Sequence, residues 1–152
     1  MIYLDTCILI YALEDGGGLG ERTRAAMRGV DDRLAASPLV LHECLVRPIR
    51  DGDNELRARF VEVYNRLVRI QMDESVFVLA AELRARHGLK APDSLHLAAA
   101  QLARCDQLWT NDERLATASR GLAVDMIGEA VRTAPADAAT RRTGAGRIHG
   151  PR

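Results

Sequence analysis

Ile2-Tyr3-Leu4-Asp5-Thr6, near the start of the chain, is the stretch that decides the fold class. Its three apolar residues predict a short strand that ends at Asp5. Similar short strands are predicted at residues 34–36, 68–72, 107–109 and 123–127, each separated from the next by helical sequence. Strands that alternate with helices are typical of an α/β domain, so we expect five strands in a mainly parallel sheet flanked by helices.

The helices between these strands are marked by residues that start or end helices. Ser37-Pro38 predicts a helix start, Asp53 and Asp73 predict helix caps, and Pro92 predicts a first helical turn. Pro48 is expected to end one helix, because proline disfavours helix continuation. The predicted helices span residues 8–13, 19–33, 38–47, 53–67, 73–86, 93–104 and 112–119, and Gly88 should close the fifth of them.

Length and charge indicate one domain followed by a different kind of segment. The 152 residues suffice for a single domain, which we place at residues 1–132. Residues 133–152 lack apolar periodicity and predict a flexible basic tail. The tail has four arginines and one aspartate, a charge of +3, while the whole chain has 21 basic and 21 acidic residues, so residues 1–132 carry −3. Overall charge therefore does not identify a nucleic-acid binder.

The cysteines and the N-terminal residues indicate in which cellular compartment the protein is expected. Cys7, Cys44 and Cys105 are odd in number and widely spaced, which argues against a disulfide scaffold or a zinc site. We interpret them as small apolar fillers in a cytoplasmic protein. The apolar residues 1–13 are short and include Asp5, so they predict neither a signal peptide nor a membrane span.

Acidic residues fall where a parallel sheet binds ligands, outside the carboxyl ends of its strands. Asp5 follows the first strand and Asp112 the fourth, Asp93 opens a helix on the same side, and Glu43 lies about two turns into the helix after the second strand. Converging carboxylates repel one another, and a hard divalent cation relieves that repulsion. We therefore expect a carboxylate centre that binds Mg²⁺ or Mn²⁺.

Each acid also has a purely structural explanation. Asp93 and Asp112 are placed to cap helices, and Asp5 is placed to open a loop. Glu43 is harder to explain in this way, because a charge on a mostly apolar helix needs a partner. His96, between Leu95 and Leu97, is interpreted as a packing residue.

Four segments together resemble the PIN-domain family, and within it the compact VapC-type toxins of bacterial toxin–antitoxin pairs. They are residues 2–6, Glu43 in its apolar helix, the sequence Ala-Pro-Asp-Ser-Leu-His-Leu-Ala at 91–98, and Trp-Thr-Asn-Asp at 109–112. With the flanking strands they cover residues 2–127 in the order and spacing typical of the family. Cys7 stands where the family often has asparagine or serine, a change that removes no carboxylate.

The resemblance implies a five-stranded parallel sheet and a metal-dependent ribonuclease. It implies Asp5 and Asp93 as direct metal ligands, with Glu43 and Asp112 completing the acidic centre. It also implies that the Thr6 and Thr110 hydroxyls orient either carboxylates or metal-bound water. The implied partners are an RNA substrate, a small antitoxin protein and a second copy of the chain.

These observations lead to one functional prediction and its alternatives. We expect a divalent-metal-dependent endoribonuclease that cleaves single-stranded RNA as the toxin of a toxin–antitoxin pair. The alternative is a PIN-like module that binds RNA or protein without cleaving it, and the presence of four acids counts against it. A haloacid-dehalogenase phosphotransferase would need an acid at Cys7, and a receiver domain would need a lysine elsewhere than Lys90.

Overall fold

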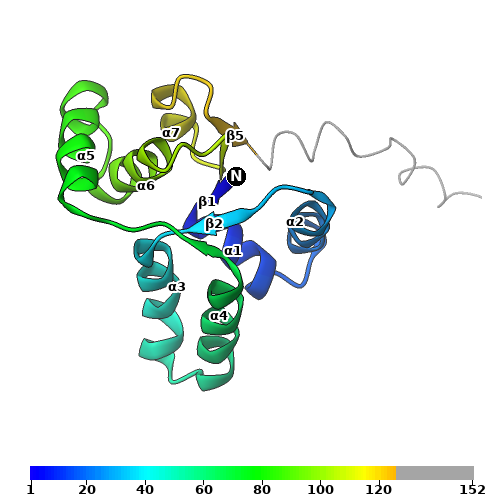
Figure 1. Cartoon of the computed structure of the whole chain (residues 1–152). Coiled ribbons are helices and arrows are strands. Elements are labelled where there is room, and N and C mark those ends of the chain that lie inside the picture. Colours follow the sequence, from blue (N-terminus) through cyan, green and yellow to red (C-terminus); the bar gives the residue numbers. More distant parts are fainter. Residues whose placement is uncertain (126–152) are drawn as a thin grey trace, which may run out of the picture.

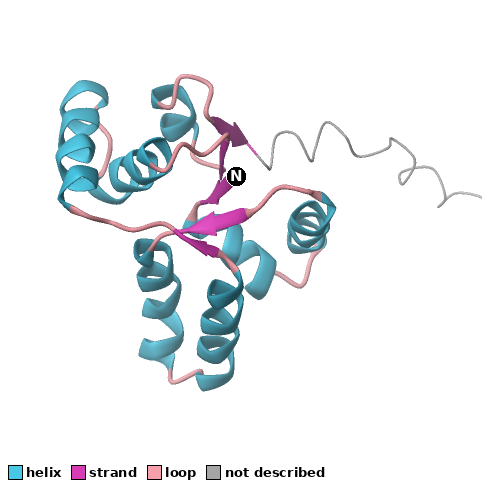
Figure 2. Ribbon diagram, viewed as in Figure 1, coloured by secondary structure: helices cyan, strands magenta, loops and turns pink. Residues whose placement is uncertain are grey.

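The computed structural model describes residues 1–125, and its centre is one parallel sheet (Figures 1 and 2). The sheet has five strands in the order β3-β2-β1-β4-β5, and every neighbouring pair is parallel. The expected fold class is therefore confirmed. The strands are β1 (Ile2–Leu4), β2 (Leu34–Ala36), β3 (Val68–Arg69), β4 (Gln107–Thr110) and β5 (Ala123–Asp125).

Helices cover both faces of the sheet. The connections from β1 to β2 and from β2 to β3 run in one direction, and those that lead to β4 and β5 run in the other. Since such crossovers are right-handed, the two sets of helices lie on opposite faces, as Figure 1 shows. No helix within residues 1–125 is long and apolar enough to cross a membrane. The first set is α1 (Thr6–Glu14), α2 (Gly18–Gly29), α3 (Pro38–Asp51) and α4 (Asn54–Arg66); the second is α5 (Glu74–His87), α6 (Ala91–Leu102) and α7 (Glu113–Ala118).

The strand order creates a switch point between β1 and β4. From β1 the chain proceeds to β2 on one side, whereas β4 lies on the other side of β1. The backbone N–H of Asp5 donates to the carbonyl of Trp109 over 3.0 Å, which extends the pairing of these two strands to the first residue after β1. Ligands of open α/β sheets bind outside the strand ends at such a point, so the topology places Asp5 where a site is expected.

The core is aliphatic and closely packed. Tyr3, Leu4 and Leu108 on the central strands are fully buried, as are Ala98, Ala99 and Ala100 on α6. The small alanine side chains allow α6 to lie close to the sheet. Cys44 and Cys105 are buried, Cys7 is partly buried, and all three are free thiols, as expected for apolar fillers.

Several predicted boundaries are wrong. α3 does not end before Pro48 but continues to Asp51, because the proline ring is fully buried and the helix ends at Gly52, whose φ of 70° is left-handed. β3 has two residues rather than five, although the N–H of Ile70 still bonds Ala36 at 3.0 Å. Residues 126–127 of the expected fifth strand, the domain boundary at 132 and the expected basic tail of 133–152 lie outside the described residues.

Candidate active site

Asp5 is held firmly at the carboxyl end of β1. It is the N-cap of α1, where its Oδ1 accepts a 2.6 Å hydrogen bond from the backbone N–H of Thr6. Its Oδ2 accepts a 2.7 Å bond from the hydroxyl of Thr110, the last residue of β4. Both partners leave the carboxylate partly exposed, with 14% of the side chain accessible. The predicted role of the Thr110 hydroxyl in orienting a carboxylate is confirmed by this contact.

Glu43 reaches the same region from the second turn of α3. Its Oε2 accepts hydrogen bonds from the Thr6 hydroxyl at 2.5 Å and from Nε2 of His96 at 2.8 Å. Burial by itself raises the pKa of Glu43, but the two hydrogen bonds outweigh it and hold the pKa below its ordinary value. Glu43 therefore remains ionised at neutral pH. The sequence showed no partner for the charge of Glu43, and the structure supplies two, Thr6 and His96. The Thr6 hydroxyl orients a carboxylate, one of the two roles expected for it.

The surroundings of Asp93 disfavour its ionised form. It lies in the first turn of α6, but the N-cap of that helix is Lys90 and no side chain makes a capping bond there. Burial raises the pKa of Asp93, and the negative charges of Asp112 and Asp5 raise it further; Lys90 partly opposes them, as His96 does in its protonated form. Asp93, Asp112 and Asp5 are thus electrostatic neighbours, although they come from three separate segments of the chain.

Asp112 has a clear structural role in addition to its position near Asp93. It is the N-cap of α7, and its Oδ1 accepts hydrogen bonds from the N–H groups of Arg114 at 2.8 Å and Leu115 at 3.2 Å. Its own N–H donates to the Thr110 hydroxyl at 3.1 Å, and that hydroxyl in turn holds Asp5. The helix-capping explanation is therefore correct for Asp112, and the same geometry fixes the acid beside Asp5.

Sequence reasoning missed how His96 takes part in this centre. Its side chain is buried, yet Nε2 lies 2.8 Å from Oε2 of Glu43 and 3.5 Å from Oδ1 of Asp5. On the other side of the ring, Nδ1 lies 3.0 Å from the hydroxyl of Tyr3. The interpretation of His96 as only a packing residue is thus incomplete. The available signal was that Tyr3 and His96 are polar groups in apolar segments, and buried polar groups need hydrogen-bond partners.

The four acids can be tested against a divalent metal ion. Within residues 1–125, no three His, Cys, Asp or Glu side chains already surround one point as metal ligands. The available donors are carboxylate and hydroxyl oxygens, and burial together with the charges of Asp112 and Asp5 raises the pKa of Asp93, a cost that a bound cation would relieve. Mg²⁺ commonly takes only one or two carboxylates and completes its shell with water and phosphate oxygens. The donor set therefore fits Mg²⁺ or Mn²⁺ held by few protein ligands.

Comparisons with known proteins agree on the fold. The family described as PIN domain matches residues 2–121. A toxin–antitoxin complex from Klebsiella pneumoniae contains a similar chain, with 24% identity and a TM-score of 0.69, over 83% of this chain and 98% of that one. FitAcB from Neisseria gonorrhoeae is similar at 20% identity and a TM-score of 0.68, over 84% of this chain and 99% of that one.

A third similar structure is that of a toxin whose activity is described. The VapC20 toxin of Mycobacterium tuberculosis, described as cleaving the sarcin–ricin loop, is similar at 14% identity and a TM-score of 0.65, over 78% of this chain and 95% of that chain. At identities this low, the likeness to solved structures concerns the fold alone. No curated protein sequence matches the chain.

Proposed function

The chain belongs to the PIN-domain family, and on that basis we propose that it is a divalent-metal-dependent endoribonuclease that cleaves single-stranded RNA. One observation carries the proposal. Asp5, Asp93 and Asp112 come from three segments and lie beside the switch point of the sheet, where burial and the charges of the other two acids raise the pKa of Asp93. We further propose that the protein is the toxin of a toxin–antitoxin pair, as in the similar complexes.

In this proposal Asp5 and Asp93 hold the metal ion. The bound ion supplies charge stabilisation at the phosphate and lowers the pKa of water. The chain's own contribution is to fix the ligands: Thr110 and the N–H of Thr6 hold the two oxygens of Asp5, and the α7 cap holds Asp112 next to them. Hydrolysis by in-line attack of water would leave a 5′-phosphate and a 3′-hydroxyl.

Glu43 keeps one carboxylate oxygen available to contact water at the site. Both of its hydrogen bonds go to Oε2, and its lowered pKa keeps it ionised. Its other oxygen, Oε1, receives neither bond and would orient the attacking water by accepting a hydrogen bond from it. About a quarter of the side chain is accessible, at 27%, so water can reach it.

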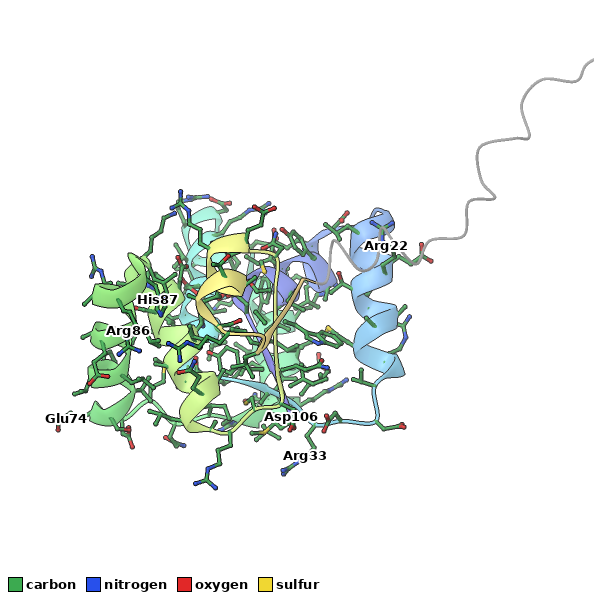
Figure 3. All side chains as sticks on the ribbon, turned by 90° about the horizontal axis from the view of Figure 1, so that it is seen from above. Arg22, Arg33, Glu74, Arg86, His87 and Asp106 are labelled. Carbon is green, nitrogen blue, oxygen red and sulfur yellow. The ribbon has the colours of Figure 1, made fainter. Side chains whose placement is uncertain are left out.

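Basic side chains near the acids support an RNA substrate. Lys90 is exposed, and its charge lowers the pKa of Asp93, which shows that the two groups are close. A surface hollow is lined by residues of α5 and α7, including His87 and Arg114. Figure 3 shows Arg86 and His87 together at one end of α5. Lys90, beside Asp93, would provide a contact for a phosphate next to the bond to be cleaved.

Purified protein is expected to cleave a fluorescent single-stranded RNA in Mg²⁺ or Mn²⁺ and to lose the activity in excess EDTA, because the acids alone cannot stabilise the charge that develops on phosphate. Gel electrophoresis with end mapping measures both cleavage and the predicted 5′-phosphate. Host ribonucleases that need no metal and leave 3′-phosphates serve as the recognisable contaminant. Undiminished cleavage in EDTA would refute the metal mechanism, and RNA binding without cleavage would establish the alternative, a binding module.

Exposed apolar side chains support protein partners. Phe77 and Val78 on α5 are 53% and 54% exposed, and Leu102 at the end of α6 is 47% exposed. On the opposite side of the sheet, Val46 and Ile49 of α3 are 51% and 55% exposed. Apolar groups gathered at a surface are typical of interaction sites. Two such places fit two partners, a small antitoxin and a second copy of the chain.

Expression of the chain alone is expected to stop or slow bacterial growth, and expression together with its antitoxin is expected to restore it. An antitoxin arginine placed against the acidic centre would neutralise the carboxylates and occlude the site. Growth curves with and without the partner measure the effect, and light scattering of the purified protein reports whether it is a dimer. Normal growth with soluble wild-type protein would exclude the toxin role.

A further inference from the structure

A chain of buried polar groups leads from the acidic centre into the core. Ser37 and Tyr3 are completely inaccessible and His96 is 2% exposed. The Ser37 hydroxyl lies 2.6 Å from the Tyr3 hydroxyl, which lies 3.0 Å from Nδ1 of His96. Nε2 of His96 then lies 2.8 Å from Oε2 of Glu43. Ser37 is also the N-cap of α3, but its side chain makes no capping bond and contacts Tyr3 instead.

For a neutral His96 ring, the chemistry of the groups gives the direction of these hydrogen bonds. A carboxylate only accepts, so Nε2 of His96 must carry the hydrogen that Glu43 receives. In the neutral ring Nδ1 then accepts, and its donor is the Tyr3 hydroxyl. Burial raises the pKa of Tyr3, which keeps this hydroxyl protonated. Tyr3 in turn accepts from Ser37, and no buried side-chain polar atom of the described residues is left without a partner.

Packing alone does not explain this arrangement. Three buried polar groups, on β1, on α6 and at the start of α3, cost free energy unless every hydrogen bond is made, and apolar side chains would fill the same volume without that requirement. The chain of hydrogen bonds also leads to the acidic centre. It ends at Glu43, and Nε2 of His96 lies 3.5 Å from Oδ1 of Asp5. Hydrogen bonds connected in this way polarise and strengthen one another.

We propose that His96 is a positioning residue, whose Nε2–H, aimed by Tyr3 and Ser37, holds the carboxylate of Glu43 in place beside Asp5. Glu43 comes from α3 and Asp5 from the end of β1, on elements that no covalent link keeps in register. His96, on α6, lies within 3.5 Å of both carboxylates through one nitrogen and, together with Thr6, which bonds both from the start of α1, fixes their separation. The inference deepens the proposed function, because it concerns how the same site is assembled.

Two substitutions at His96 separate positioning from packing. The amide nitrogen and oxygen of glutamine are bonded to one carbon, as Nδ1 and Nε2 of histidine are. His96→Gln can therefore keep both the donor and the acceptor and with them both hydrogen bonds. His96→Leu fills the space and removes both. Loss of such a supporting hydrogen bond costs about 10–100-fold in activity or metal affinity. We expect His96→Leu to lower kcat within that range with little change in KM for RNA, and His96→Gln to retain most of the activity.

Two tyrosine substitutions test the hydrogen bond between Tyr3 and His96, and they remain informative if His96→Leu does not fold. Tyr3→Phe removes one hydroxyl and leaves Nδ1 of His96 without its donor, so we expect kcat to fall toward the lower end of the same range. Tyr64→Phe is the matched control, because Tyr64 is also buried, at 6% exposed, but lies on α4 and forms no hydrogen bond with these groups. Its kcat should equal that of the wild type.

Metal binding without RNA provides a measurement that does not depend on catalysis. Because Nε2 of His96 also lies 3.5 Å from Asp5, a proposed metal ligand, calorimetric titration with Mn²⁺ alone should show weaker affinity for His96→Leu than for wild type and near-normal affinity for His96→Gln. If the wild type binds Mn²⁺ but cleaves no RNA, the proposed function fails and these affinities still decide the role of His96. Folded His96→Leu or Tyr3→Phe with wild-type affinity and kcat would overturn the inference, as would equal losses in Tyr3→Phe and Tyr64→Phe.

Discussion

Replacing Asp5 by asparagine is expected to lower kcat for RNA cleavage by about 10²–10³-fold, the effect of removing one group that stabilises charge in the transition state. The asparagine side chain would keep an oxygen to accept from the N–H of Thr6, and the Thr110 hydroxyl can turn to accept from the new amide. The fold should therefore survive, while the negative charge needed to hold a metal ion is lost. Single-turnover cleavage assays with matched circular dichroism spectra measure both quantities.

Asp31→Asn is the matched control for this substitution. Asp31 is exposed in the loop before β2, at the opposite edge of the sheet from the carboxyl ends of the strands. It should leave kcat unchanged. If Asp5→Asn keeps more than half of the activity, Asp5 does not hold the metal ion and only opens α1.

Asp93→Asn is expected to stabilise the metal-free protein at neutral pH, or at least not to destabilise it. Burial and the charges of Asp112 and Asp5 raise the pKa of Asp93 in the folded state, so its ionised form is unfavourable there. An acid with a raised folded-state pKa contributes most to stability below its unfolded pKa and loses that contribution as pH rises through the folded value. The wild type should therefore gain relative stability on mild acidification, and the asparagine variant should gain less.

A bound metal ion should make the wild type melt at a higher temperature than Asp93→Asn, the reverse of the order expected without metal. At 100 times its Kd, an ion that binds only the folded state adds about 2.7 kcal/mol, a rise in melting temperature on the order of 10 °C for a domain of this size. The wild type should show this rise in millimolar Mg²⁺ or Mn²⁺, and Asp93→Asn only a small part of it. Asp73→Asn, at the exposed N-cap of α5, is the control and should keep the full metal-induced rise.

Thermal unfolding of the wild type, Asp93→Asn and Asp73→Asn at several pH values, with and without metal, measures all of these differences in stability. The structural alternative makes the opposite prediction for both measurements. If Asp93 only stabilises the start of α6, its replacement should lower the melting temperature without metal, and the wild type should not respond to metal.

Local sequence was sufficient for the fold class and for most helix ends. Asp53 and Asp73 cap α4 and α5 as predicted, and Gly88 ends α5 in a left-handed conformation, because each signal acts within one turn of the chain. Pro48 was misleading for the opposite reason. Its ring is fully buried inside α3, and packing against other elements outweighs the lost backbone hydrogen bond.

The sequence by itself also determined which four acids would be candidates, since strand ends in a parallel sheet meet at one edge. It did not determine what those acids contact. Only the tertiary structure pairs Glu43 with His96 across two helices and directs the Ser37 hydroxyl away from its helix end toward Tyr3. Hydrogen bonds between residues 34, 53 and 93 positions apart leave no periodic pattern in the chain, and they form only when the sheet and its two layers of helices bring those side chains together.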